Sequence, residues 1–247
     1  EAKLWDMCSA YASMARVLNH YNSSSKYDSK DWDKPNYLSN RPLQTSNSKP
    51  STSNFISAAS IWLTFEAMAE VGRPDIDASW KRLGNAQKIA WKTGTSFGFR
   101  DGWAIGISGN YVVGVWVGNA DGEGRPGLTG ISAAAPVLFE IFGSLPKTDW
   151  FKMPVNDLKQ VMVCKQSGCL ASQYCNDTKK ELVPKNSNVS ITCSYHKPIH
   201  LDTTEQYRVT DACVSPLDMR TVSWFVLPPV QEYYFKTKNP MYKSLPP

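Results

Sequence analysis

The chain has 247 residues, of which 42% are hydrophobic and 12% aromatic, and its formal net charge is +5. This composition is typical of globular proteins and leaves room for one large core or two domains. The charge is mild and the basic residues are scattered, so no nucleic-acid interface is predicted. No stretch approaches the roughly 18 consecutive apolar residues of a membrane span, and residues 1–14 lack the features of a signal peptide. If the protein is exported or anchored, the segment responsible is expected outside this chain.

The first region of the chain is predicted to be helical. Residues 2–20 place apolar side chains three to four apart, which is the pattern of an amphipathic helix. Residues 21–53 are polar and lack periodicity, and because this stretch is longer than a usual connecting loop, a surface excursion near a site is expected. Residues 57–71 again show helical spacing, and a shorter helix capped by Asp77 or Ser79 is expected to follow.

From residue 89 the apolar spacing changes from that of a helix to that of a strand. Runs at residues 89–97, 102–108 and 111–118 predict three successive antiparallel strands, with a tight hairpin turn at residues 109–110. A glycine-rich loop and a second helix follow, and Ser132 is predicted to be the N-cap of this helix rather than a nucleophile. Helices, an antiparallel sheet and a closing helix together predict an α+β domain.

The pattern of apolar and polar residues changes near residue 148. Residues 158–227 hold short apolar runs separated by polar turns, which predicts a small all-β module, and a tail rich in proline and tyrosine ends the chain. The predicted organisation is therefore an α+β domain at residues 1–147, followed by a small β-rich domain with clustered cysteines at residues 148–247.

The strongest candidate functional segment is the run Lys92, Thr93, Gly94, Thr95 and Ser96. At a sheet edge it would offer an ammonium group, hydroxyl groups and a glycine that leaves room for a peptide-like ligand along the backbone. Such a strand suits an acyl donor that carries a carboxylate, and a backbone N–H group there would stabilise an oxyanion beside a serine nucleophile. Because Lys-Thr-Gly also recurs by chance, its context has to decide.

Here the triplet follows a helix, occupies a strand and precedes a hairpin, which is the setting of the third motif of penicillin-binding proteins and serine β-lactamases. Residues 89–146 resemble the end of the transpeptidase domain of class A penicillin-binding proteins, and the stretch "GNADGEGRPGLTGISAAAP" is most similar to the 1C type. Residues 223–247 resemble the C-terminal extension of that type. The resemblance implies part of a penicillin-binding/β-lactamase-like fold, an antiparallel sheet flanked by helices.

The resemblance also implies roles for the segment. Lys92 resembles the lysine that faces the nucleophile and the substrate carboxylate, whereas Thr93 and Thr95 resemble the hydroxyl groups that bind this carboxylate. The backbone N–H of Thr95 is similar to one half of the oxyanion hole. Lys92 and Thr95 are therefore the predicted catalytic residues, and the predicted substrate-binding residues are Thr93, Gly94, Thr95 and Ser96. No cofactor is expected.

The serine nucleophile and the second motif of this family are not found in the chain. Ser-x-x-Lys strings occur at residues 23–26, 46–49 and 144–147, but the first two lie in polar sequence and the third follows Lys-Thr-Gly. The string at residues 108–110 fits Ser-x-Asn but lies in the predicted hairpin. We therefore expect the C-terminal part of a longer transpeptidase, without its nucleophile or its glycosyltransferase domain and inactive alone.

Every cysteine except Cys8 lies within residues 164–213, and such clustering indicates disulfides or a metal site. Sulfur and imidazole at short spacings suit tetrahedral zinc. The zinc alternative has the ligands Cys193, His196 and His200, with Cys175 or Cys213 as the fourth. The resemblance implies a periplasmic location, where thiols oxidise, and disulfides of undetermined pairing are therefore the favoured prediction.

Two functions are compatible with these features. The first is part of a D,D-transpeptidase on the periplasmic side of the bacterial inner membrane, anchored outside this chain, whose full-length form binds peptidoglycan stem peptides and β-lactams. The second is a periplasmic scaffold whose C-terminal domain docks a partner protein or a glycan. Labelling of the full-length protein with a fluorescent penicillin distinguishes the two.

Overall fold

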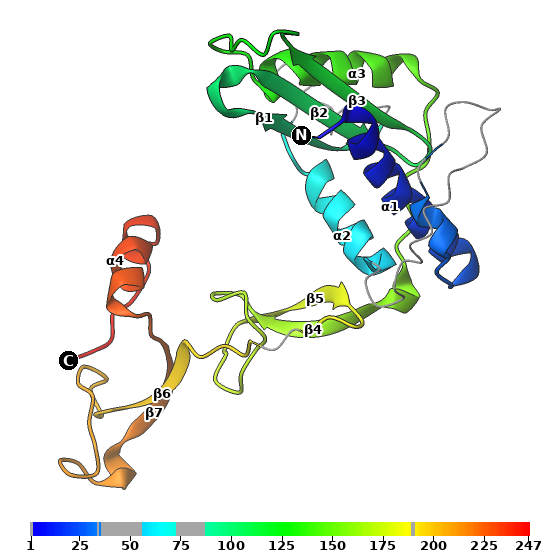
Figure 1. Ribbon diagram of the computed structural model, residues 1–247. Helices are drawn as coiled ribbons and strands as arrows, with labels where there is room; N and C mark the ends of the chain where they lie inside the picture. Colours follow the sequence, from blue (N-terminus) through cyan, green and yellow to red (C-terminus); the bar gives the residue numbers. More distant parts are fainter. Residues whose placement is uncertain (1, 34, 36–55, 73–86, 189–190) are drawn as a thin grey trace. The chain divides into compact units, whose positions relative to one another are not determined.

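The computed structural model describes residues 2–33, 35, 56–72, 87–188 and 191–247 (Figure 1). The chain divides into two compact units, Glu1–Leu158 and Lys159–Pro247, here called unit 1 and unit 2. This division follows Leu158, whereas the pattern of apolar and polar residues changes near residue 148. The functional assignment of residues 1–147 and 148–247 to two domains stays a prediction.

Two helices begin unit 1. Helix α1 spans Leu4–Ser24 and ends at Ser25, which adopts a left-handed conformation with φ 56° and donates its N–H to Tyr21 O. Helix α2 spans Ala58–Ala69, and its N-cap Ser57 accepts a hydrogen bond from Ser60 N. Both helices confirm the predictions that were made from the apolar spacing at residues 2–20 and 57–71. The shorter helix expected after Asp77 falls on residues 73–86, outside the described part of the chain.

A three-stranded antiparallel sheet forms the centre of unit 1. Its strands are β1 (Ala90–Thr95), β2 (Asp101–Ile107) and β3 (Val112–Gly118), in the order β1-β2-β3. The hairpin between β2 and β3 is closed by a hydrogen bond from Ser108 N to Tyr111 O, 2.9 Å long. The three strands were predicted from the alternation of apolar residues, and the hairpin was predicted from Gly109-Asn110. Strand β1 lies at the edge of the sheet.

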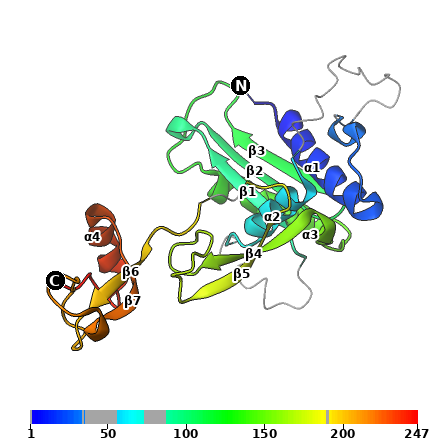
Figure 2. The same ribbon diagram turned by 90° about the horizontal axis from the view of Figure 1, so that it is seen from below.

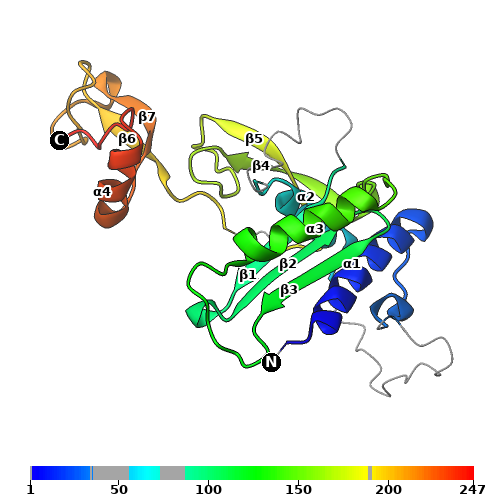
Figure 3. The same ribbon diagram turned by 90° about the horizontal axis from the view of Figure 1, so that it is seen from above.

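Helices cover both faces of this sheet, as Figures 1 and 3 show. Residues of α1 and α2 pack with Ala90 and Ile107 in one apolar cluster. On the other face, Trp91 and Ala104 pack against α3 (Ala135–Ser144). This arrangement confirms the predicted α+β class for unit 1.

A π-helical turn, Gly130–Ala134, leads into α3. Its N-cap is Thr129, whose side chain accepts from Ser132 N, while the Ser132 hydroxyl interacts in return with Thr129 N. The prediction of Ser132 as the N-cap was therefore wrong by three residues, because the two hydroxyl residues form a capping box in which Thr129 comes first.

Unit 2 is rich in β-structure. Strand β4 (Leu158–Cys164) begins at the division between the units and pairs with β5 (Thr178–Pro184), and β6 (His196–Leu201) pairs with β7 (Arg220–Phe225). The tail also forms a helix, α4 (Pro229–Lys238), which the sequence analysis did not predict (Figure 2). Phe235 of α4 contacts Phe225 of β7, with ring centroids 6.0 Å apart.

Unit 2 has few buried side chains. Among its described residues, the buried ones are Val163, Cys164, Cys193, His196 and Leu201. Two apolar clusters, in contrast, hold unit 1 together. No helix in the described part of the chain is both long enough and apolar enough to cross a membrane.

Candidate functional site

Lys92 to Thr95 form the last four residues of edge strand β1, and Ser96 follows the strand. Lys92, Gly94 and Thr95 are exposed, whereas Trp91, just before them, is buried. In the register with β2, Lys92 lies opposite Ile105 and Thr95 lies opposite Gly102. The buried beginning of the strand therefore anchors it in the core and leaves the polar end accessible.

The side chains of the segment alternate between the two faces of the sheet. Thr95 Oγ1 accepts a hydrogen bond from Gly130 N at 3.0 Å, which places Thr95 on the α3 face. Thr93 lies on the same face, because a Cβ atom at Gly130 would be 3.0 Å from Thr93 Cβ. Lys92 and Gly94 therefore lie on the opposite face. A ligand along the strand edge would meet groups from both faces.

The backbone groups of β1 also alternate in direction. Ser96 N–H donates to Asp101 O at 3.0 Å, which directs this N–H toward β2. Successive N–H groups of an antiparallel strand point to opposite sides, so those of Thr95 and Thr93 point away from β2. Because β1 is the edge strand of the sheet formed by the described residues, these amides lie at the edge that is open within this part of the chain. Lys92 Nζ donates to the carbonyl of Thr93 at this same edge.

Gly94 is not required by the packing of unit 1. An added Cβ would come no closer than 3.6 Å to Trp103 Cβ, which is an ordinary contact. Gly130 differs sharply, since a Cβ there would lie 2.4 Å from Trp103 O and 2.5 Å from Gly94 O. The described residues therefore leave room for a side chain at position 94, and the role of Gly94 in substrate binding stays a prediction.

Ser96 is engaged in the turn that follows β1. Its Oγ accepts a hydrogen bond from Asp101 N at 2.8 Å. It also precedes the short 3-10 turn Phe97–Phe99, in which Gly98 has a φ of 75°. The hydroxyl of Ser96 therefore shapes the connection to β2, and its role in substrate binding stays a prediction.

None of the described Ser-x-x-Lys or Ser-x-Asn strings takes the place of the missing motifs. Ser23 Oγ donates to His20 O and Ser144 Oγ donates to Glu140 O, so both hydroxyls are used at helix ends. Ser108 lies at the hairpin, at the opposite end of the sheet from Thr95. The string at residues 46–49 lies outside the described residues.

Two cavities of unit 1 are lined by α1 and the β2–β3 hairpin, with volumes of about 530 and 270 Å³. Lys92 lines neither of them. The binding of a peptide-like ligand along the strand beside Lys92 therefore stays a prediction.

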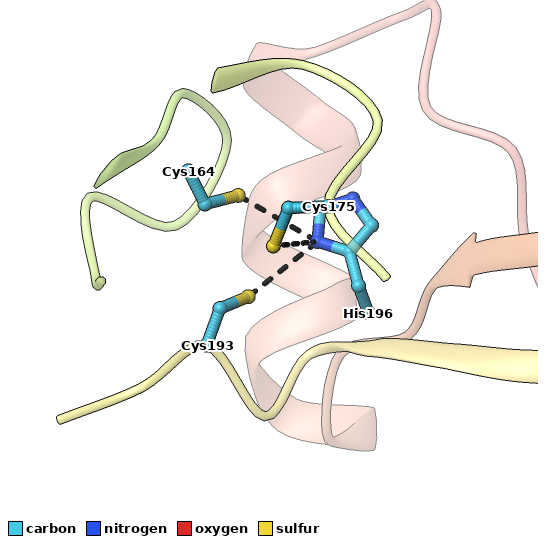
Figure 4. A group of neighbouring side chains, drawn as sticks. All are labelled: Cys164, Cys175, Cys193 and His196. Atoms are coloured by element: carbon cyan, nitrogen blue, oxygen red, sulfur yellow. Dashed lines mark hydrogen bonds between the residues drawn. The ribbon is translucent and has the colours of Figure 1, made fainter. Parts of the chain in front are cut away.

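A second group of reactive side chains gathers in unit 2. The Sγ atoms of Cys164, Cys175 and Cys193 converge on the ring of His196 (Figure 4). The distances from His196 Nδ1 to these sulfurs are 3.6, 3.6 and 3.4 Å, and the four atoms all lie within 4.8 Å of one another. We refer to these four residues as the cysteine–histidine cluster.

The cluster corrects the predicted ligand set. His200 lies outside it, since its Nδ1 contacts Thr221 Oγ1 at 2.8 Å, and Cys213 Sγ donates to Thr210 O. Cys164, which the sequence analysis missed, takes the remaining place. The short spacing of Cys193 and His196 was a usable signal, but nothing local marks Cys164, which is distant from both in the sequence.

The favoured prediction of disulfides is not met in the structure, where all six cysteines are free thiols. The physical reason is the position of His196: three of the sulfurs surround its ring instead of pairing. Cys169 Sγ donates to Ser167 O, and Cys213 lies exposed in a turn.

Two thiols of the cluster differ in acidity. Burial raises the pKa of Cys193, but hydrogen bonds from the side chains of Ser167 and His196 and from nearby backbone groups outweigh it and lower this pKa to about 6. Burial is also the largest influence on Cys175, where it raises the pKa of the thiol. The pKa values of the Cys193 and Cys175 thiols are therefore shifted in opposite directions, although both sulfurs lie beside the same imidazole.

Comparison with known proteins relates the chain to a family of cell-wall proteins. Penicillin-binding protein 1C of Escherichia coli (strain K12) is 35% identical over 140 residues, which cover 57% of this chain and 15% of that protein. A crystal structure of penicillin-binding protein 1A from Haemophilus influenzae aligns over 56% of this chain and 22% of that chain, with 20% identity and a TM-score of 0.39. No protein-family profile matches the chain.

The chain thus spans 15% of the length of the curated relative that it matches. The match extends over more than half of this chain at an identity of 35%. The sequence similarity and the α+β unit that carries Lys-Thr-Gly agree: this chain contains a part that is like the C-terminal part of a penicillin-binding protein.

Proposed function

We propose that this chain supplies the Lys-Thr-Gly strand of a peptidoglycan D,D-transpeptidase whose serine nucleophile lies elsewhere in the same protein. The observation that carries the proposal is the open edge of β1, where the amides of Thr93 and Thr95 face away from β2 and Lys92 is exposed. An exposed strand edge binds an extended peptide by adding it to the sheet as a further strand.

In the proposed reaction, a stem peptide that ends in D-Ala-D-Ala lies along β1. The serine oxygen bonds to the carbonyl carbon of the penultimate D-alanine, and the terminal D-alanine leaves with a proton on its nitrogen. An amine of a second stem peptide then attacks the ester and releases the serine. In both steps the backbone N–H of Thr95 donates to the oxyanion, which is the kind of contact that contributes most to acyl transfer.

The side chains of Thr95 and Lys92 have different roles in the proposed binding of the substrate. Thr95 Oγ1 already accepts from Gly130 N, so its own hydrogen is directed by this contact and is available to the substrate carboxylate. Lys92 adds positive charge close to the carboxylate and the nucleophile. In the free chain its ammonium group donates to Thr93 O, a contact that a ligand strand would replace.

The proposal is tested by labelling the full-length protein with a fluorescent penicillin, which acylates the same serine. We expect Lys92→Ala to abolish labelling. The matched control is Lys180→Ala, which removes an exposed strand lysine from β5 and should leave labelling unchanged. Undiminished labelling of Lys92→Ala, with the protein folded, would refute the assigned role.

A docking function is the second candidate, and the surface of α4 favours it. Val230, Tyr233 and Tyr234 are 72%, 69% and 67% exposed, and tyrosine is enriched in protein interfaces. In this alternative, the second unit binds a periplasmic protein or a glycan, and Lys92→Ala has no effect on the function of the protein. A periplasmic location at the inner membrane, with the anchor outside this chain, belongs to both proposals.

A further inference from the structure

We propose that Cys164, Cys175, Cys193 and His196 bind one zinc ion, and that this ion stabilises the fold of unit 2. The inference is independent of the transpeptidase proposal, because all four residues lie in Lys159–Pro247.

The first argument is that hydrogen bonding cannot explain the geometry of the cluster. One imidazole nitrogen offers either a single proton or a single lone pair. His196 Nδ1 nevertheless has three sulfurs at 3.4 to 3.6 Å, approaching from the three directions that Figure 4 shows. At most one of these contacts can be satisfied by the ring nitrogen itself. Three sulfurs around one nitrogen therefore indicate a shared partner that all four atoms bind.

The second argument is that the distances fit a tetrahedral ion. Zinc binds sulfur at about 2.3 Å and nitrogen at about 2.0–2.1 Å, so a tetrahedral zinc holds a bound sulfur and a bound nitrogen about 3.5–3.6 Å apart. The three sulfur–nitrogen distances in the cluster are 3.6, 3.6 and 3.4 Å. Three sulfurs and one imidazole also form one of the usual ligand sets of structural zinc sites, which leave no position open to water.

Backbone hydrogen bonds and strand pairing hold three of the four cluster residues, Cys164, Cys193 and His196, in place. Cys164 closes β4, and the turn after it is fastened by bonds from Cys164 N to Cys169 O and from Gly168 N to Cys164 O, both 2.8 Å long. Cys193 N donates to Leu170 O at 2.8 Å, which brings the segment before β6 beside this turn. His196 opens β6, and its ring contacts Phe225 of β7. The site therefore joins the β4 end of the unit to the paired strands β6 and β7.

The third argument is that few side chains are buried among the described residues of unit 2. Of the five residues that are buried in the described part of unit 2, three belong to the cluster, and the other two are the aliphatic side chains Val163 and Leu201. Small domains with so little apolar core are usually held by disulfides or by a metal ion. Since all six cysteines are free, the cluster is the feature that can supply this stability.

The test is metal analysis of the full 247-residue chain, purified without chelators. We expect one zinc ion per chain in the wild type and less than about one-tenth of this in Cys164→Ser and His196→Asn. The matched controls are Cys169→Ser, Cys213→Ser and His200→Asn, which change the same residue types in the same unit outside the cluster. All three should retain the ion.

A third variant of the cluster keeps the test decisive if Cys164→Ser and His196→Asn fail to fold. His196→Cys preserves four ligands and should still bind metal. With cobalt in place of zinc, its sulfur-to-metal charge-transfer band should grow by about one-third relative to wild type, as expected for four thiolates instead of three. An unchanged band would show that His196 is not a ligand and would overturn the proposed site.

Three results would overturn the proposal for the wild-type chain: zinc at less than about one-tenth of an ion per chain, iron or copper in its place, or an intact mass that reveals a disulfide involving Cys164, Cys175 or Cys193. Retention of zinc by both Cys164→Ser and His196→Asn would do the same.

Discussion

The two units of this chain place their reactive groups in opposite ways. In unit 1, the Lys-Thr-Gly segment is continuous in the sequence and exposed on an edge strand. In unit 2, the cysteine–histidine cluster is assembled from distant positions, and three of its four residues are buried. The first arrangement suits a surface that has to receive a ligand and further catalytic groups. The second suits a site that is complete by itself and stabilises the polypeptide around it.

The units also differ in what stabilises them. The sheet of unit 1 is packed on both faces, by α1 and α2 on one side and by α3 on the other. Unit 2 has no comparable cluster among its described residues. We therefore expect unit 1 to depend on apolar packing and unit 2 to depend on its metal site.

Removal of zinc should have the largest effect and should be confined to unit 2. Structural zinc contributes on the order of 10 kcal/mol to the folding of small metal-binding domains. After treatment with excess chelator, the backbone amides of residues 159–247 should exchange with deuterium much faster, while those of β1, β2 and β3 should keep their protection. The measurement is hydrogen exchange with mass spectrometry. Equal protection of unit 2 with and without chelator would contradict the comparison.

Gly130→Ala should have the next largest effect, and it should act on unit 1. The added Cβ would lie 2.4 Å from Trp103 O and 2.5 Å from Gly94 O, so the backbone of β1, β2 or the π-helical turn has to move. We expect a loss of more than about 4 kcal/mol in the free energy of unfolding of unit 1. Thermal unfolding followed by circular dichroism tests this, and the zinc content should stay at the wild-type value.

Leu138→Ala should destabilise unit 1 by about 2–5 kcal/mol, because it opens a cavity in the cluster between α3 and the sheet. The matched control is Leu217→Ala in unit 2, where the leucine is 96% exposed and its loss should change stability by less than about 0.5 kcal/mol. Denaturant titration measures both. A small effect of Leu138→Ala would show that the packing of α3 is not what stabilises unit 1.

Gly94→Ala should separate stability from function. The new methyl group meets only Trp103 Cβ, at 3.6 Å, so the fold should be retained and even gain about 0.5–1 kcal/mol over glycine. If a ligand lies along the edge of β1, the same methyl group should slow acylation of the full-length protein by fluorescent penicillin at least about tenfold, which corresponds to about 1.4 kcal/mol. Wild-type acylation rates would remove Gly94 from the proposed site.

The elements of unit 1 could be predicted from the sequence because their signals are local. Apolar spacing identified α1, α2 and the three strands, and Gly109-Asn110 identified the hairpin. The N-cap of the turn before α3 was misplaced because Thr129 and Ser132 carry interchangeable hydroxyl groups, and only their mutual hydrogen bonds decide which comes first. Helix α4 was missed because the proline and tyrosine content of the tail indicated irregular structure, although Val230, Tyr233 and Tyr234 have helical spacing.

The candidate sites could be predicted to different extents for the same reason. Lys92 to Ser96 are adjacent, so their residue types identify the segment, and tertiary structure adds that the segment lies at an open edge. The ligands of the cluster span Cys164 to His196, and their choice depends on how a turn, a loop and two strand ends meet. Sequence spacing suggested His200, and either Cys175 or Cys213 as the fourth ligand, but the fold directs His200 and Cys213 to Thr221 and Thr210 instead.

What the sequence alone determined is the order of helices and strands in unit 1 and the identity of the Lys-Thr-Gly segment, because both depend on neighbouring residues. Only the tertiary structure decided which amides of β1 point away from β2 and which of the clustered cysteines meet at His196. Those properties depend on strand order and on backbone hydrogen bonds between segments that are far apart in the chain.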